Sequence, residues 1–203
     1  QIVDVSDPTS PTLVGTSGTM LAAAEFVAVV DNTAYVTDFT EGVLQIFDIS
    51  DPTTPTIVGS YTGFSFPSDI AAAGTNVFVT DFTGFHIIDA SVPSAPVSAS
   101  FTSIGIARGI TVDGNTAYIA GGQGLEVFDV SDITAPVSIG SYDAPQASRG
   151  IALSSNNAYL ACEGFGLQIV SVQSTCAECP ADFTGEGELD IFDVLAFIEA
   201  FNA

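Results

Sequence analysis

The sequence repeats one phrase at intervals of about 40 residues. Successive copies begin 44, 41, 40 and 42 residues apart. A fixed period of this length indicates one small structural unit that is stacked several times along the chain. The five copies are "IVDVSDP" from Ile2, "IFDISDP" from Ile46, "IIDASVP" from Ile87, "VFDVSDI" from Val127 and "IVSVQST" from Ile169.

Two further phrases keep the same period. One phrase appears as "NTAYVTDF" from Asn32 and "NTAYIAGG" from Asn115, and the other precedes it as "GITVDG" from Gly109. Each full unit therefore holds four short segments, which we name strands a, b, c and d. The frame consists of a c–d pair at 1–16, full units at about 24–60, 68–101 and 108–142, and a partial a–b–c unit at 149–172.

The segments have the composition of β-strands. They are rich in Val, Ile, Tyr, Phe and Thr, and strand c alternates in "LQIFDIS". Four strands in about 40 residues is typical of one blade of a β-propeller. We therefore expect an all-β fold over residues 1–172, built from about four four-stranded blades, with a short helical tail over 173–203 that carries a calcium loop.

Carboxylates mark the corner between strands c and d. Asp48 and Asp51, like Asp129 and Asp132, can accept backbone N–H groups in Asx turns. Pro52 fixes φ and ends the pairing of strand c, so that the chain can reverse into the outer strand. We interpret these aspartates as turn formers rather than as metal ligands.

The two ends of the repeat frame leave three arrangements open. Strand d at Pro11–Thr16 could complete the last blade within the chain, or the chain could be a fragment of a longer propeller. Alternatively, the strands at Gln1–Thr16 of one molecule could complete the blade at Arg149–Val172 of the next. That head-to-tail contact would build rings or filaments.

The charge balance narrows the choice of partners. The chain has 24 acidic residues, two arginines and no lysine, for a net charge of −22. A phosphate backbone would be repelled, so nucleic acid is excluded as an expected partner. No apolar run reaches the roughly 20 residues of a membrane span. The acidity fits an extracellular protein that is kept soluble by its charge or neutralised by divalent cations.

The segment after Val172 contains a candidate calcium loop, "DFTGEGELDIFD". Its glycine, Gly187, falls at the sixth position, where the loop turns sharply, and "IFDVLAFIEAF" has helical spacing. Four carboxylates within twelve residues repel one another unless a cation neutralises them. The expected Ca²⁺ ligands are Asp182, Thr184, Glu186, Glu188 (through its carbonyl), Asp190 and Asp193.

Two resemblances to known families follow from these motifs. The phrases "LQIFDISDPTTPTIVGSY" and "LEVFDVSDITAPVSIGSY", with "GNTAYIA" upstream, resemble LVIVD repeats of bacterial and archaeal surface or secreted β-propellers. The calcium loop resembles half of a dockerin, or an EF-hand half-repeat. Ile191 and Phe192 replace the polar pair that dockerins use toward cohesin. The first resemblance implies a fold and a location and supplies no catalytic residues.

Three cysteines, one histidine and two arginines remain. The disulfide candidates are Cys162, Cys176 and Cys179; "CAEC" could also be a redox pair or half of a zinc site, but no second such pair exists. We interpret His86 as structural. Arg108 and Arg149 share one repeat position, and we expect them to form salt bridges to Asp81 or Asp38, with anion binding as the alternative.

These observations favour a function without catalysis. The leading hypothesis is an extracellular or cell-surface structural or adhesion protein that is stabilised by calcium and self-associates head to tail. The alternative is a secreted propeller that binds a carbohydrate or another ligand and is anchored to a larger assembly by its dockerin-like tail. Its partners would be another extracellular protein or a polysaccharide.

Overall fold

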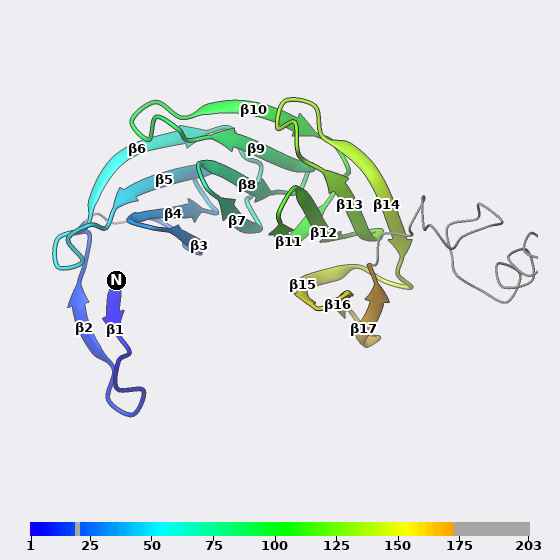
Figure 1. Ribbon diagram of the computed structural model, residues 1–203, viewed down its shortest axis with the longest axis horizontal. Coiled ribbons are helices and arrows are strands. Elements are labelled where there is room, and N and C mark those ends of the chain that lie inside the picture. Colours follow the sequence, from blue (N-terminus) through cyan, green and yellow to red (C-terminus); the bar gives the residue numbers. More distant parts are fainter. Residues whose placement is uncertain (19–20, 173–203) are drawn as a thin grey trace, which may run out of the picture.

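The computed structural model describes residues 1–18 and 21–172. Three four-stranded antiparallel sheets stand side by side along an arc, with a two-stranded hairpin before them and a three-stranded sheet after them (Figure 1). We number the four larger sheets as blades 1 to 4 in chain order and call β1–β2 the N-terminal hairpin. The described residues contain no helix long and apolar enough to cross a membrane.

The strands follow the chain from the inner to the outer edge of each blade, so that each sheet is a simple meander. The N-terminal hairpin is β1 (Ile2–Asp4) and β2 (Thr12–Gly15). Blade 1 is β3 (Ala24–Val30), β4 (Thr33–Asp38), β5 (Val43–Asp48) and β6 (Thr56–Thr62). Blade 2 is β7 (Asp69–Ala73), β8 (Asn76–Thr80), β9 (Phe85–Asp89) and β10 (Val97–Thr102). Blade 3 is β11 (Ala107–Asp113), β12 (Thr116–Gly121), β13 (Gly124–Asp129) and β14 (Val137–Asp143), and blade 4 is β15 (Ser148–Ser154), β16 (Asn157–Cys162) and β17 (Gly166–Ser171).

The core lies between blades rather than within one sheet. Leu44 and Ile46 on β5 pack against Ile70 on β7 of the next blade, and all three are buried. Phe85 and Ile87 on β9 meet Ile110 on β11 in the same way. Each blade thus covers one face of its neighbour with alternate side chains of strands a and c, as the alternation in the sequence predicts.

A second contact between blades lies at one position of the outer strand. Gly15 on β2 packs on the carbonyl oxygen of Pro52, and Gly59 on β6 packs on that of Pro93, so closely that a Cβ atom would overlap the oxygen. In blade 2 Ser100 replaces the glycine, and its hydroxyl donates a hydrogen bond to Ile133 O at 2.7 Å. We call this contact the corner seat, because Pro52, Pro93 and Ile133 occupy the same position of the c–d corner in successive blades.

The c–d corners contain the expected Asx turns. Asp48 accepts the Ser50 N–H at 2.8 Å. Asp51 accepts the N–H of Thr53 at 2.9 Å and its hydroxyl. The corner of blade 3 repeats both turns at Asp129 and Asp132, and the hydrogen bonds lower the pKa of all four aspartates. The corner of blade 2 keeps the first turn at Asp89 and has Val92 in place of the second aspartate. The interpretation of these carboxylates as turn formers is confirmed.

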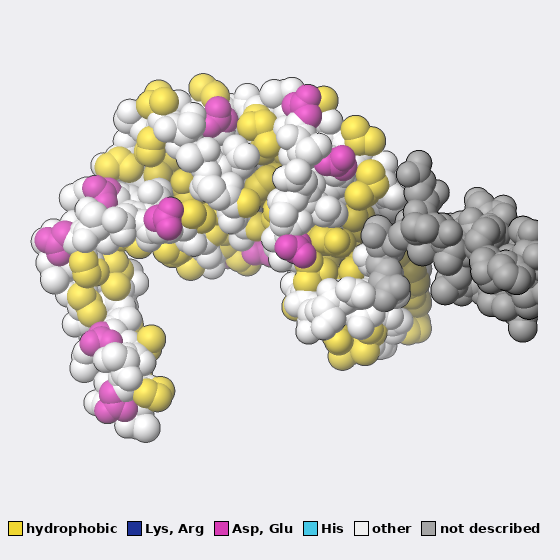
Figure 2. All heavy atoms as spheres, viewed as in Figure 1, with side chains coloured by type: hydrophobic (Ala, Val, Ile, Leu, Met, Phe, Trp, Pro, Cys, Tyr) yellow, Lys and Arg dark blue, Asp and Glu magenta, His cyan; other side chains and the backbone are white. Residues whose placement is uncertain are grey.

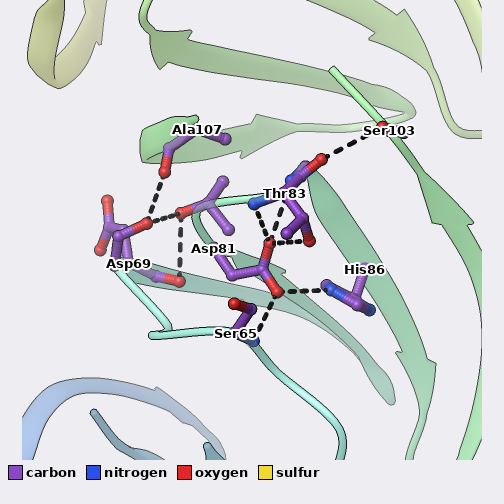
Figure 3. Close-up of polar contacts among 10 residues, drawn as sticks. Ser65, Asp69, Asp81, Thr83, His86, Ser103 and Ala107 are labelled. Carbon is purple, nitrogen blue, oxygen red and sulfur yellow. Dashed lines mark hydrogen bonds and ion pairs between the residues drawn. The ribbon is translucent and has the colours of Figure 1, made fainter. Parts of the chain in front are cut away.

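A buried aspartate holds the loops at the inner end of blade 2 (Figure 3). Asp81 Oδ1 accepts the N–H and hydroxyl of Thr83, both at 2.7 Å, and the Gly84 N–H. Its Oδ2 accepts the Ser65 N–H at 2.8 Å and lies 2.9 Å from His86 Nε2. Burial acts to raise the pKa of Asp81, but these hydrogen bonds outweigh burial and leave the pKa below its usual value.

Blade 1 contains the same kind of node. Asp38 accepts the Ala23 N–H through Oδ2 and the N–H groups of Thr40 and Glu41 through Oδ1, each at 3.0 Å. The Ala23 N–H is the main reason that the pKa of Asp38 lies below its usual value. Both aspartates therefore tie the loop that enters strand a to the loop that leaves strand b.

The arc stays open over the described residues. β2 pairs with β1, and β17 pairs with β16; neither pairs with the other (Figure 1). The structure therefore does not show β2 completing the last blade within the same chain, because β2 pairs with β1 and the edge of β17 stays unpaired in the described residues. The helical tail and calcium loop lie outside the described residues, and the division of the chain at residue 172 stays a prediction.

The corner seat predicts a specific glycine requirement. Gly59→Ala should lower the free energy of unfolding by about 1–3 kcal/mol, because the new Cβ atom would force β6 away from Pro93 O. Gly140→Ala is the matched control: its Cβ would meet only Val127 Cβ, at 4.0 Å, so the change should stay within about 0.5 kcal/mol. Urea unfolding measures both. Equal effects of the two substitutions would contradict the close approach at Gly59.

The Asp81 node predicts an acid-dependent stability. Since its pKa is lowered in the folded state, its contribution is present above the unfolded pKa of about 4 and is lost as pH falls through the folded value. Asp81→Asn should lower the free energy of unfolding by about 2 kcal/mol or more at pH 7, and the difference from wild type should shrink by pH 3. The exposed corner variant Asp129→Asn serves as control. A pH-independent difference for Asp81→Asn would contradict the proposed charge.

Candidate functional site: the axial cleft and the end faces

One position of the repeat lines the inside of the arc. It lies at the start of strand a, the innermost strand of every blade along the arc (Figure 1). This position carries Glu25, Ser68, Arg108 and Arg149 in blades 1 to 4. Both arginines of the chain are therefore placed together by the repeat, although they lie 41 positions apart in the sequence.

These four side chains line one cleft of about 420 Å³, which we call the axial cleft. Its volume lies within the roughly 300–1,000 Å³ that is typical of small-molecule sites. Three phenylalanines and one further carboxylate complete the lining, so it combines apolar surface with a few polar groups. They are Phe26 on β3, Phe39 and Phe82 in the loops after strand b, and Asp69 on β7.

The two arginines do not form the expected salt bridges to Asp81 or Asp38. The acceptor positions of both aspartates are occupied by backbone N–H groups, and in Asp81 also by His86. Arg149 instead pairs with Glu163 of its own blade, and both side chains are exposed. The equivalent of Glu163 in blade 3 is Gly122, so Arg108 has no carboxylate at that place.

Arg108 lies over an aromatic ring of the preceding blade. Its Cζ atom is 5.5 Å from the centroid of Phe82, within the range of a cation–π contact. Its buried Nε atom has no hydrogen-bond partner among the described residues. The positive charge of Arg108 is therefore held in place by a ring, and no carboxylate of the described part of the chain pairs with it.

Phe82 belongs to a cluster of three rings. Phe39, Phe66 and Phe82 have centroid distances of 5.2, 5.7 and 6.2 Å. Phe66 has a φ of 58°, which is unfavourable for a residue with a side chain, and 49% of its surface is exposed. The backbone strain and the exposed apolar ring are both energetically unfavourable, and such strain is common at functional sites.

Asp69 and Ser68 connect the cleft to the next blade. Asp69 Oδ2 accepts the Ile110 N–H at 2.9 Å, and Ser68 Oγ donates to Ala107 O at 2.6 Å. Burial raises the pKa of Asp69, and the N–H bonds from Ile110 and Ile70 oppose that shift. These two side chains are engaged in the framework, which leaves Glu25 as the carboxylate of the cleft without a hydrogen-bond or ion-pair partner in residues 1–18 and 21–172.

The ends of the arc form a second kind of candidate site. Leu167 on β17 occupies the register position of Leu44, Phe85 and Leu125, which are at most 2% exposed, yet Leu167 is 62% exposed. Ile169, two residues along, is similarly exposed. The outer edge of β17 is also unpaired in the described part of the chain.

The opposite end exposes the complementary face. Val27 on β3 is 63% exposed, while Ile70, at the same position in blade 2, is 7% exposed because blade 1 covers it. A largely apolar cavity of about 710 Å³ lies between the N-terminal hairpin and this face. Its lining includes Ile2 of the hairpin and Val29 of β3. One end thus presents strand-c side chains and the other presents strand-a side chains, the two halves of an ordinary blade interface.

The remaining predicted residues have mixed outcomes. His86 is structural: it pairs with Asp81 and packs between the rings of Phe64 and Phe101. Cys162 is buried, forms no disulfide within residues 1–18 and 21–172, and lies 3.1 Å from Ser148 Oγ. No group of three potential metal ligands occurs in residues 1–18 and 21–172.

The other predicted site residues lie outside the described residues, and their roles stay predictions. These are Cys176 and Cys179 of the disulfide candidates, and Asp182, Thr184, Glu186, Glu188, Asp190 and Asp193 of the calcium loop.

Sequence reasoning predicted the unmatched ends of the repeat frame, but it did not identify the aromatic cluster or the exposed side chains of the end faces. A signal for the cluster was present in the phrase that ends strand b, which reads "TDF" in blades 1 and 2 but "AGG" and "ACE" in blades 3 and 4. Phe66 had no such signal, because its approach depends on the path of the loop between β6 and β7.

Several solved structures have a similar fold. The computationally designed protein Ika4 is 11% identical, with a TM-score of 0.64 over 79% of this chain and 98% of Ika4. A functionally unknown protein from Desulfotomaculum acetoxidans is 14% identical, with a TM-score of 0.66 over 80% of this chain and 57% of that one. Kuenenia stuttgartiensis hydrazine synthase is 16% identical, with a TM-score of 0.61 over 76% of this chain and 47% of that one. At these identities the likeness concerns the fold alone, and this chain spans only about half of the two natural proteins.

Comparison with curated proteins yields no match. The profile of the LVIVD repeat, however, matches residues 1–19, 23–63, 67–101 and 104–144, which is more than half of the chain. These four segments coincide with the N-terminal hairpin and blades 1 to 3. The chain belongs to the LVIVD-repeat family.

Proposed function

We propose that this protein is a non-enzymatic extracellular structural or adhesion module that self-associates head to tail through its end faces. The observation that carries the proposal is the exposure of Leu167 and Ile169 at one end and of Val27 at the other, in register positions that are buried at the inner blade interfaces. The occupant that fits both faces is a second copy of the chain, since it offers strand-a side chains to strand-c side chains.

The contact would follow the rules of the inner interfaces. β2 of one copy, released from β1 of its own hairpin, would pair with the free edge of β17 of another, as strand d pairs with strand c in blades 1 to 3. Burial of Leu167, now 62% exposed, would contribute about 1.5–3 kcal/mol. Such a contact uses different surfaces on the two copies, so it propagates into rings or filaments.

Charge supports an extracellular role and limits the strength of the assembly. Acidic side chains are spread over the face shown in Figure 2, where no arginine is visible. At −22 per chain, copies repel one another at low ionic strength, so the contact should strengthen with salt. The hydrogen-bond capacity of the buried Asp38 and Asp81 is used by the framework, which favours a scaffold over a catalyst.

Two complementary variants test the head-to-tail contact. Leu167→Asp should block one end and Leu13→Asp the other, so each variant alone should be monomeric while an equimolar mixture forms dimers that cannot grow. Light scattering at about 0.15 M salt measures the masses, and wild type should give larger assemblies visible by electron microscopy.

Val92→Asp is the matched control, because it adds the same charge at an equally exposed position where blades 1 and 3 already carry aspartate. It should assemble like wild type. A wild-type monomer at all concentrations, or a mixture of the two end variants that stays monomeric, would contradict self-association.

The tail gives a second, independent prediction, based on the sequence. If Asp182 and Asp193 are the first and last ligands of a Ca²⁺ loop, the Asp182→Ala/Asp193→Ala double variant should lose calcium binding in titration calorimetry. Chelation should lower the melting temperature of wild type and leave the double variant unchanged, because binding stabilises only a chain that holds the ion. Unchanged calcium affinity in the double variant would remove the loop assignment.

A further inference from the structure

The axial cleft combines groups that the framework does not use. Arg108 has no anionic partner, Glu25 has no hydrogen-bond partner among the described residues, and both line the same cleft. In a chain with 24 acidic residues and two arginines, the placement of both cations at one cleft is the largest local departure from the overall charge. The cleft is therefore the one place where this protein can offer a positive charge to a ligand.

The position of Arg108 and its lack of a hydrogen-bond partner at Nε among the described residues suit a carboxylate ligand. Its guanidinium is held against Phe82, which restricts its motion and lowers the entropy that a bound anion would cost. A planar guanidinium binds a carboxylate through two parallel hydrogen bonds, a geometry that a small spherical anion cannot use. Arg149 is a weaker candidate, because Glu163 already pairs with it.

The rest of the lining restricts what can carry the carboxylate. Phe26, Phe39 and Phe82 offer ring surface, which favours a ligand with an apolar face. Glu25 repels a simple anion but accepts hydrogen bonds from hydroxyl groups. A ligand that satisfies both must carry hydroxyl groups at some distance from its carboxylate, on a ring that also has an apolar face.

We propose that the axial cleft binds a short sugar acid, such as a monomeric or dimeric uronate. Arg108 receives the carboxylate, the phenylalanine rings stack on the C–H face of the sugar, and Glu25 accepts its hydroxyl groups. The site draws on blades 1, 2 and 3, so it exists only when the blades are stacked. Glu25 and Phe26 also line the cavity beside the N-terminal hairpin, so the cleft adjoins that end face, whereas Arg108 and Phe82 line the cleft alone.

Titration calorimetry with digalacturonate tests the proposal on the full chain. Wild type should bind with a Kd of about 1 mM or below, and Arg108→Gln should raise the Kd at least about tenfold. Arg149→Gln tests the second arginine of the cleft, and it should raise the Kd by less than Arg108→Gln does, because Glu163 already pairs with Arg149. Circular dichroism melts verify that the variants fold.

Three probes separate the sources of affinity. Digalactose lacks the carboxylates and should bind at least about tenfold more weakly, while benzoate lacks the hydroxyls and inorganic phosphate lacks the ring. Equal affinity for digalacturonate and phosphate would reduce the site to a general anion site and overturn the proposal. Equal affinity for digalacturonate and benzoate would overturn the role of Glu25 and the hydroxyl groups.

A measurement without variants gives an independent answer. Phenylglyoxal modifies exposed arginine, and this chain has only two, so peptide mass spectrometry reports Arg108 and Arg149 separately. Saturating digalacturonate should slow modification of Arg108 at least about fivefold and leave Arg149 within about twofold. No binding of digalacturonate up to about 20 mM, or equal protection of both arginines, would overturn the proposal.

Discussion

The interface between consecutive blades is the interaction on which the whole structure depends. A single four-stranded sheet of this length has two faces, and neither is covered within its own blade. Ile70 is buried only because blade 1 lies against it, as its 63%-exposed counterpart Val27 demonstrates. Stability is therefore a property of neighbouring pairs, as in other repeat proteins, and each added blade protects the one before it.

The corner seat makes this stacking directional. The outer strand of one blade accepts the corner of the following blade, through Gly15, Gly59 or the hydroxyl of Ser100. Each contact uses the backbone carbonyl oxygen at the same position of the corner. The two glycines approach it closely, and the serine hydroxyl donates a hydrogen bond to it. A glycine and a serine thus solve one packing problem in different ways, which explains why the repeat tolerates the change at this position.

Local features of the fold could be predicted from sequence, and contacts between distant loops could not. The corners of Asp48 and Asp129 were predictable, since an Asx turn involves residues two apart. The partner of Arg108 was not, because Phe82 belongs to another blade and the choice depends on Gly122, where blade 4 has Glu163. Arg108 and Arg149 share one repeat position but have different partners, because the residue that faces them is Gly122 in blade 3 and Glu163 in blade 4.

That divergence shows how a repeat protein can acquire a site without disturbing its framework. Residues that hold the blades together recur: a buried aspartate in blades 1 and 2, and the Asx corners throughout. Residues that face the axis differ between blades, from Glu25 through Ser68 to Arg108 and Arg149. Because these side chains point to a common cleft, each blade can contribute a different group to one ligand at little structural cost. A stack of similar units thereby becomes asymmetric at its axis, where a charged ring with two unlike edges can be bound in a single orientation.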